Sequence, residues 1–156
     1  SYNYGAGNSN RVRRAYRLLL ICSVCYAMLF CLLIQLFPGV FAAIFTSNAE
    51  LLAFTKPMLR IYTLALGLFG IQIACQMTFT ALGNAKASII VAVMRKFILL
   101  LPLIYIMPHL YTADLTKAVF MAEPVADVLA VAFTGVLFFF EFPKALRAMP
   151  KSEKKS

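Results

Sequence analysis

The apolar run from Ala118 to Phe142 constrains the fold of this chain more than any other segment. It is long enough to cross a bilayer, since a spanning helix needs about 20 predominantly apolar residues. Two acids, Glu123 and Asp127, nevertheless lie inside it, four positions apart and therefore on one helical face. Pro124 between them removes a backbone donor and favours a kink. Asp127 lies about 14 Å into the run, where a charge costs about 3 kcal/mol, so we expect both acids to face a protein interior or a watery cavity.

The composition predicts an all-α integral membrane protein. The chain is 62% hydrophobic and only 13% charged, whereas soluble domains are about 45–50% apolar and about 25% charged. Helices are expected because lipid cannot satisfy free backbone groups, and the alternating pattern of a membrane barrel is missing. Four transmembrane helices are predicted, at Leu18 to Phe37, Ile61 to Ala85, Phe97 to Tyr111 and Ala118 to Phe142.

These spans divide the chain into three parts. Residues 1–17 are predicted to form a cytoplasmic loop and the interfacial, basic start of a helix, residues 18–142 the four-helix transmembrane part, and residues 143–156 a basic cytoplasmic tail. Ser47 and Glu50 have capping-box spacing, so a helix is expected to begin at Ser47. Asp114 is the expected N-cap of the last span, which Glu141 and Pro143 are expected to close.

The net charge of +9 is concentrated at the ends of the predicted spans. No basic, aromatic-interleaved face exists, so nucleic acid is not an expected partner. Twelve of the basic residues fall on one predicted side of the membrane and three on the other, which places both ends of the segment in the cytoplasm. The residues expected to anchor helix starts at the headgroups are Arg11, Arg13, Arg14, Arg95 and Lys96.

Polar residues without charge gather in the second predicted span. We expect Gln72 and Gln76 either to line a cavity or to bond neighbouring helices. Cys22 and Cys25 have the spacing of half a metal or redox site, but they lie in an apolar helix with no second pair and are expected to be packing residues. No metal or cofactor is therefore predicted.

Three segments resemble the multidrug and toxic compound extrusion (MATE) family of efflux transporters. Ser1 to Arg17 resembles the cytoplasmic loop after the family's eighth helix. Gln76 to Ser88, followed by Arg95 and Pro102, resembles the link between its tenth and eleventh helices. Ala122 to Ala130 resembles the start of its twelfth helix. The bacterial multidrug-pump branch is the most similar, and the resemblance covers nearly the whole chain.

The resemblance implies a twelve-helix antiporter of two six-helix lobes, of which this chain is a C-terminal fragment with helices nine to twelve. Its partners would be the missing N-terminal lobe of the same polypeptide, the lipid bilayer and a small amphipathic substrate, in a bacterial plasma (inner) membrane. Members of the family export organic cations and other amphipathic compounds in exchange for protons or sodium. The span Ile61 to Ala85 contains no acid, so no sodium site is transferred to it. Glu123, Asp127 and Pro124 remain as candidates for coupling.

Other functions stay open at this point. A lipid-linked oligosaccharide flippase of the same superfamily is the nearest alternative, although flippases tend to line their cavity with basic residues. A small membrane enzyme or subunit would use Glu123 and Asp127 as acid and base, but no nucleophile or metal cluster accompanies them. A purely structural pair, bonded to Thr or Gln of a neighbouring helix, is the third possibility.

Overall fold

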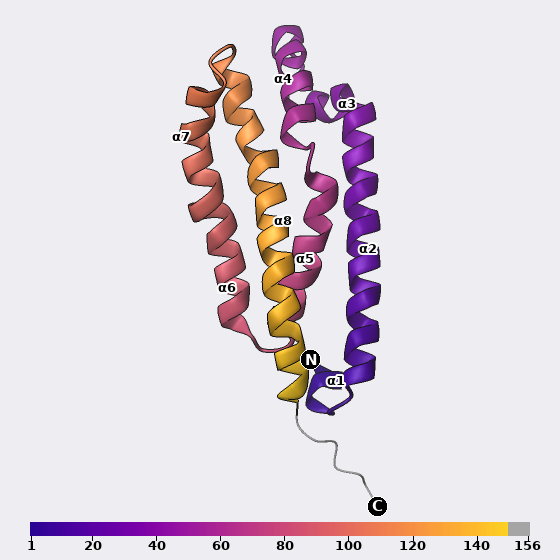
Figure 1. Cartoon of the computed structure of the whole chain (residues 1–156). Helices are drawn as coiled ribbons and strands as arrows, with labels where there is room; N and C mark the ends of the chain where they lie inside the picture. Colours follow the sequence, from indigo (N-terminus) through magenta and orange to yellow (C-terminus); the bar gives the residue numbers. More distant parts are fainter. Residues whose placement is uncertain (150–156) are drawn as a thin grey trace, which may run out of the picture.

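The computed structural model describes residues 1–149, and over that range the regular elements are all helical (Figure 1). Seven residues of the predicted basic tail, 150–156, lie outside the described part of the chain. The elements in order are α1 (Tyr2–Gly5), α2 (Ser9–Leu36), α3 (Pro38–Ala43), α4 (Ala49–Tyr62), α5 (Leu66–Ala81), α6 (Ala85–Val93), the π-helix η1 (Met94–Leu100), α7 (Leu101–Leu110) and α8 (Leu115–Arg147).

Three continuous helical columns are long and apolar enough to cross a membrane: α2, the column of α6, η1 and α7, and α8. The pair of α4 and α5 passes the same test together and is bent by 51° at a short break. Counting the bent pair as one span gives four, which agrees with the predicted all-α membrane fold.

The helices run up and down in one bundle (Figure 1). The N-terminal α1, the turn between α5 and α6, and the end of α8 lie at one end of the bundle, while α3 and the turn between α7 and α8 lie at the other. This arrangement matches the predicted topology, in which both ends of the segment lie on the same side.

Small residues let α5 approach α2 closely. A Cβ on Gly70 would lie 2.6 Å from the Ser23 carbonyl oxygen and 2.9 Å from Val24 Cα, both backbone atoms. Ala74, one turn further along the same face, has no exposed surface. Close backbone approach of this kind is how membrane helices gain packing energy without a hydrophobic driving force.

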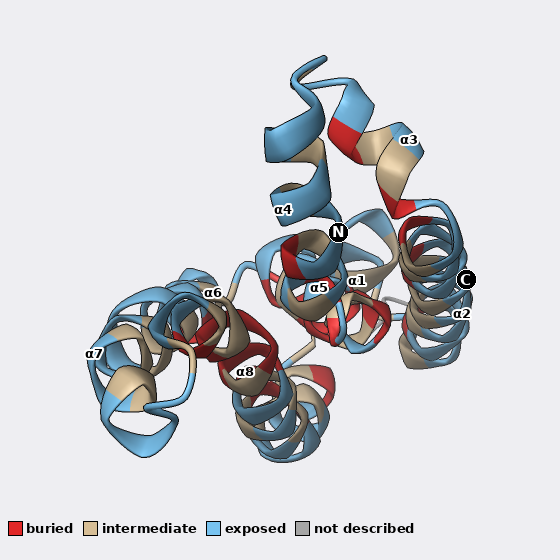
Figure 2. Ribbon diagram, turned by 90° about the horizontal axis from the view of Figure 1, so that it is seen from above, coloured by how far each residue is buried: buried red, intermediate tan, exposed pale blue. Residues whose placement is uncertain are grey.

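Buried residues concentrate on the sides of α5, α6 and α8 that face one another (Figure 2). The aromatic part of this core joins distant segments, with the ring centroids of Tyr16 and Phe138 4.5 Å apart and those of Phe79 and Phe138 5.2 Å apart. The same core includes Ala87 and Val91 of α6. The column that contains η1 is therefore fixed against α5 and α8 at its lower end.

Short polar side chains begin the helices. Asp114 accepts a hydrogen bond from the Lys117 backbone N–H at 3.0 Å, as expected for the N-cap of α8. That backbone bond lowers the pKa of the Asp114 carboxyl. Gly83 follows the C-cap of α5 and has a φ of 77°, a conformation that glycine adopts readily at a helix end. The predicted start at Ser47 is wrong by one residue, because Asn48 is the N-cap and accepts hydrogen bonds from the backbone N–H groups of the next turn.

Three predicted boundaries differ from the structure. The second span is interrupted over residues 63–65, so Ile61 belongs to α4 rather than to one continuous helix up to Ala85. The last helix does not end at Pro143 but continues to Arg147, helped by an ion pair of 2.8 Å between Lys144 and Glu141. The third span does not begin at Phe97, because the helical column runs without interruption from Ala85 to Leu110.

Candidate functional site

The two acids of α8 face the interior of the bundle. Glu123 and Asp127 are both buried, with Asp127 only 4% exposed, and Ala130 and Thr134 continue the same buried face. The helix runs through Pro124 without interruption, although the proline cannot donate to the carbonyl of Phe120. The predicted orientation of these carboxylates, away from lipid, agrees with their burial.

Arg95 binds both carboxylates. Its Nε donates to Asp127 Oδ1 at 2.7 Å, and its Nη2 donates to Glu123 Oε1 at 2.7 Å. The Nη2 atom also lies 2.7 Å from Asp127 Oδ1. The Arg95 side chain is only 14% exposed, so this is an ion triad shielded from bulk water. Hydrogen bonds between charged groups are shorter and stronger than neutral ones.

The π-helix η1 positions Arg95 opposite α8. Arg95 follows Val91 by four residues, and Val91 is packed into the core of α5 and α8. Pro102 lies just beyond η1, and its ring would clash with the carbonyl of Ile98 in a regular α-helix. A wider turn before the proline avoids that clash, and π-helical turns are frequent at functional sites.

A third element covers the flat face of the guanidinium. Arg95 Cζ lies 4.4 Å from the centroid of the Phe69 ring on α5. A desolvated cation over an aromatic face gains about 2 kcal/mol or more. The guanidinium of Arg95 is therefore held by carboxylates at its edge and by an aromatic ring on its face, from two neighbouring elements.

Lys96 adds a second cation beside the triad. Its Nζ lies 3.8 Å from Glu123 Oε1, and its side chain is 53% exposed. With two cations and two carboxylates, the cluster carries no net formal charge. A neutral cluster is far less costly to bury than isolated acids would be.

A cavity of about 260 Å³ opens next to Glu123 and Lys96. Tyr62 and Phe120 line it from α4 and α8, with their rings edge to face and their centroids 6.3 Å apart. The remaining lining residues are apolar. The cavity thus has mainly apolar walls, with the charged side chains of Glu123 and Lys96 among its lining.

Within the described part of the chain, two buried side-chain oxygens have no hydrogen-bond partner: Gln72 Oε1 on α5 and Thr134 Oγ1 on α8. Gln72 is buried and Gln76 is half-buried, and their role at a cavity or between helices stays a prediction. Among the described residues, no group of three or more His, Cys, Asp or Glu side chains is placed to hold a metal ion.

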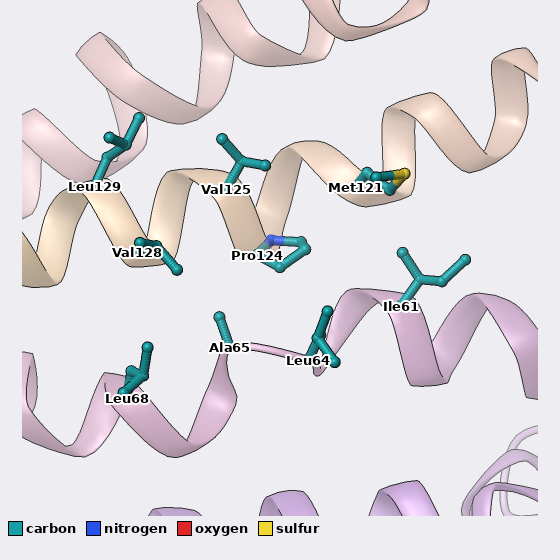
Figure 3. Close-up of a pocket in the computed structure, with 9 residues that line it drawn as sticks. All are labelled: Ile61, Leu64, Ala65, Leu68, Met121, Pro124, Val125, Val128 and Leu129. Carbon is teal, nitrogen blue, oxygen red and sulfur yellow. The ribbon is translucent and has the colours of Figure 1, made fainter. Parts of the chain in front are cut away.

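A larger cavity, of about 460 Å³, lies on another face of α8 (Figure 3). There Pro124 and Val128 face Leu64 and Ala65 at the break between α4 and α5 (Figure 3). Its lining is apolar, and neither Glu123 nor Asp127 contributes to it. The interrupted part of one span therefore lies opposite the proline of another, with the ion triad outside this cavity.

The placement of Arg95 corrects an expectation. Arg95 was expected as a headgroup anchor, but it lies inside a helical column and pairs with α8. Arg11, Arg13 and Arg14 are exposed near the start of α2, where an anchoring role stays a prediction. Lys96 is exposed but lies at the same height as Arg95.

A signal for the buried arginine was present in the sequence. The residues from Ala87 to Met94 are uncharged and mostly apolar, so the third span can begin before Arg95 rather than after it. With that start, Arg95 lies about 14 Å from Lys86 along the helix, deep enough to need a partner. The acids of the fourth span are the partners of opposite charge.

A family model described as MatE matches residues 1–106, more than half of the chain. The chain belongs to the MatE family. MatE proteins are transporters and not enzymes, which agrees with the buried charges and spanning helices described above. Arg95 lies within the matched MatE region, whereas Glu123 and Asp127 follow it. No curated protein and no solved structure matches the chain.

Proposed function

We propose that this chain is part of a secondary active antiporter that exports amphipathic, mainly cationic compounds in exchange for protons or sodium. The observation that carries the proposal is a pair of buried carboxylates on a membrane-spanning helix, Glu123 and Asp127. Ionisable groups at that depth mark ion and substrate pathways more often than structural contacts. Membership of the MatE family supports transport as the general activity.

In this proposal the two carboxylates are the groups that exchange one cation for another. They bind a cationic substrate in one state of the transporter and a coupling ion in the other, and alternating access separates the two states. Asp127 lies deeper in the predicted span than Glu123 and has the larger effect. Pro124 between them gives the helix a point at which the two carboxylates can reorient.

The complete transporter, in this proposal, includes an N-terminal lobe that completes the substrate cavity. The protein would lie in a bacterial plasma (inner) membrane, with both ends of the segment in the cytoplasm. The common position of α1 and the end of α8 supports this orientation (Figure 1). The basic residues exposed around the start of α2 support it as well.

Reconstitution of the intact transporter in liposomes tests the activity. We expect an outward gradient of ethidium to form when an inward proton or sodium gradient is imposed, and the gradient that drives it names the coupling ion. Export that is insensitive to both gradients would contradict secondary antiport. Liposomes carrying a protein with Asp127→Asn serve as the matched control for leakage.

One observation favours a second candidate, a lipid-linked oligosaccharide flippase. Lys96 is half exposed beside the cavity at Glu123, and with Arg95 it supplies basic groups to the interior, as a diphosphate headgroup would require. A Lys96→Gln change separates the two functions. It would impair translocation of a fluorescent lipid diphosphate by a flippase, whereas cation export by an antiporter should persist.

A further inference from the structure

We propose that Arg95 is a tethered cation that competes with the transported cation for Glu123 and Asp127, in a niche that selects planar, guanidinium-like groups. The inference rests on the proposed function for the identity of the competing ligand. In this proposal Arg95 controls when the carboxylates of Glu123 and Asp127 are available to the substrate. The competition itself can be measured as binding, without transport.

The hydrogen bonds place Arg95 where a bound cation would lie. Arg95 donates side-chain hydrogen bonds to both carboxylates, through Nε and Nη2 at 2.7 Å each. A carboxylate oxygen that accepts such a bond is not free to bind a second cation at the same position. A substrate cation that takes up the same two oxygens, Glu123 Oε1 and Asp127 Oδ1, must therefore displace Arg95.

The niche is shaped for a flat cation. Its two carboxylates meet one edge of the guanidinium, and the ring of Phe69 covers the face at 4.4 Å. A rounded ammonium ion can approach the ring, but it lacks the planar fork that directs N–H donors to two carboxylates while its face lies on the ring. A guanidinium or amidinium group can take the place of Arg95 with the same contacts.

The local helix geometry offers a route for Arg95 to leave. It lies in the π-helical segment Met94–Leu100, between regular α-helices on both sides. If the π-helical segment became a regular α-helix, the register of the chain would shift by one residue. The Arg95 side chain would then turn by about 100° relative to α8, since an α-helix has 3.6 residues per turn. The same rotation would also move Lys96, whose Nζ lies 3.8 Å from Glu123 Oε1.

Competition lowers the apparent affinity for the substrate by the fraction of protein in which the site is free. If Arg95 occupies the carboxylates in nine molecules of ten, its removal strengthens cation binding by about tenfold. A purely structural role for Arg95 predicts no such gain.

Equilibrium dialysis of the purified intact transporter with radiolabelled benzamidinium, a planar amidinium cation, tests this competition. We expect Arg95→Ala to bind this cation about tenfold more tightly than the wild type. Ethylguanidinium, which replaces the atoms that the substitution removes, should weaken that binding in Arg95→Ala and leave the wild type unchanged. N-Ethylurea, a neutral molecule of nearly the same shape, should have no effect on either protein.

Equal affinities of the two proteins for benzamidinium would overturn the proposal, as would equal competition by ethylguanidinium and N-ethylurea. If Arg95→Ala does not fold, Arg95→Ala combined with Glu123→Gln leaves a single carboxylate and less repulsion, and the same pattern is expected with a smaller gain. A doubly substituted protein without competition by ethylguanidinium would equally overturn it. Failure of ion-coupled export in liposomes would overturn the proposed function without deciding this competition.

Discussion

Arg95 Nε lies 2.7 Å from Asp127 Oδ1 and thereby joins the π-helical segment of one membrane-spanning column to the middle of α8. The two residues are 32 positions apart in the sequence, so the bond ties two spans rather than neighbouring turns. Burial of the pair is tolerated because each charge is neutralised and hydrogen-bonded. Loss of either partner leaves a charge without compensation.

Substitution of Arg95 tests the structural cost of this pairing. Arg95→Ala leaves Asp127 without its cation and Glu123 with only the more distant Lys96, and we expect a loss of about 3–5 kcal/mol in the free energy of unfolding. Replacing the whole triad with neutral residues, by Arg95→Gln, Glu123→Gln and Asp127→Asn together, should restore most of it, since no buried charge remains. Thermal unfolding of the purified protein in detergent measures both effects.

The exposed Arg13 on α2 is the matched control, and Arg13→Gln should change the free energy of unfolding by less than about 0.5 kcal/mol. An equal response to Arg13→Gln and Arg95→Ala would show that the triad contributes no more than a surface charge. A triple neutral variant as unstable as Arg95→Ala would argue against charge compensation as the cause.

Two glycines test the packing of α2 against α5. A Cβ on Gly70 would lie within 3 Å of backbone atoms of Ser23 and Val24, so Gly70→Ala should destabilise the protein by about 1–3 kcal/mol. Gly135 on α8 has no atom within 4 Å of a new Cβ, and Gly135→Ala should be neutral or stabilising by up to about 1 kcal/mol. Melting temperatures that shift equally for both variants would contradict the close approach of the two helices.

The topology can be tested by labelling single cysteines in a variant without the four native cysteines. Ser9→Cys and Asn84→Cys lie at one end of the bundle and Thr112→Cys at the other (Figure 1). In intact cells we expect an impermeant maleimide to label Thr112→Cys from outside and to reach the other two only after the membrane is permeabilised. Labelling of Ser9→Cys and Thr112→Cys from the same side would contradict the four-span arrangement.

The long-range outline of this fold was predictable because the bilayer imposes it. Apolar length located the spans, and the charge bias gave their direction, since both follow from the cost of placing polar groups in lipid. Asp114 was predictable as a cap, because a side-chain acceptor before an apolar helix satisfies its free backbone donors. Glu123 and Asp127 were predictable as an interior pair for the same electrostatic reason.

Other features depend on contacts between segments and were predicted wrongly or not at all. The sequence predicts Arg95 at the headgroups, because a basic residue between two apolar stretches fits either the end or the interior of a span, whereas in the structure Arg95 pairs with both acids. Arg95 lies in the interior because Glu123 and Asp127 on α8 carry the opposite charge. The residue pattern of a single segment cannot reveal such a pairing. The break at residues 63–65 and the π-helical turn are likewise settled by packing and by Pro102, not by hydropathy.

Asp127 carries the central claim, that a buried carboxylate couples cation export to an ion gradient. Asp127→Asn keeps the size of the side chain but removes its charge, and Glu141→Gln changes an acid that pairs with Lys144 and lies outside the ion triad. The decisive measurement is the rate of gradient-driven ethidium export by liposomes with equal amounts of wild-type, Asp127→Asn, Glu123→Gln and Glu141→Gln protein. We predict a loss of about tenfold or more for Asp127→Asn, as coupling energies above about 1.4 kcal/mol imply, a smaller loss for Glu123→Gln and none for Glu141→Gln. Export by Asp127→Asn at the wild-type rate across the physiological pH range would contradict the account.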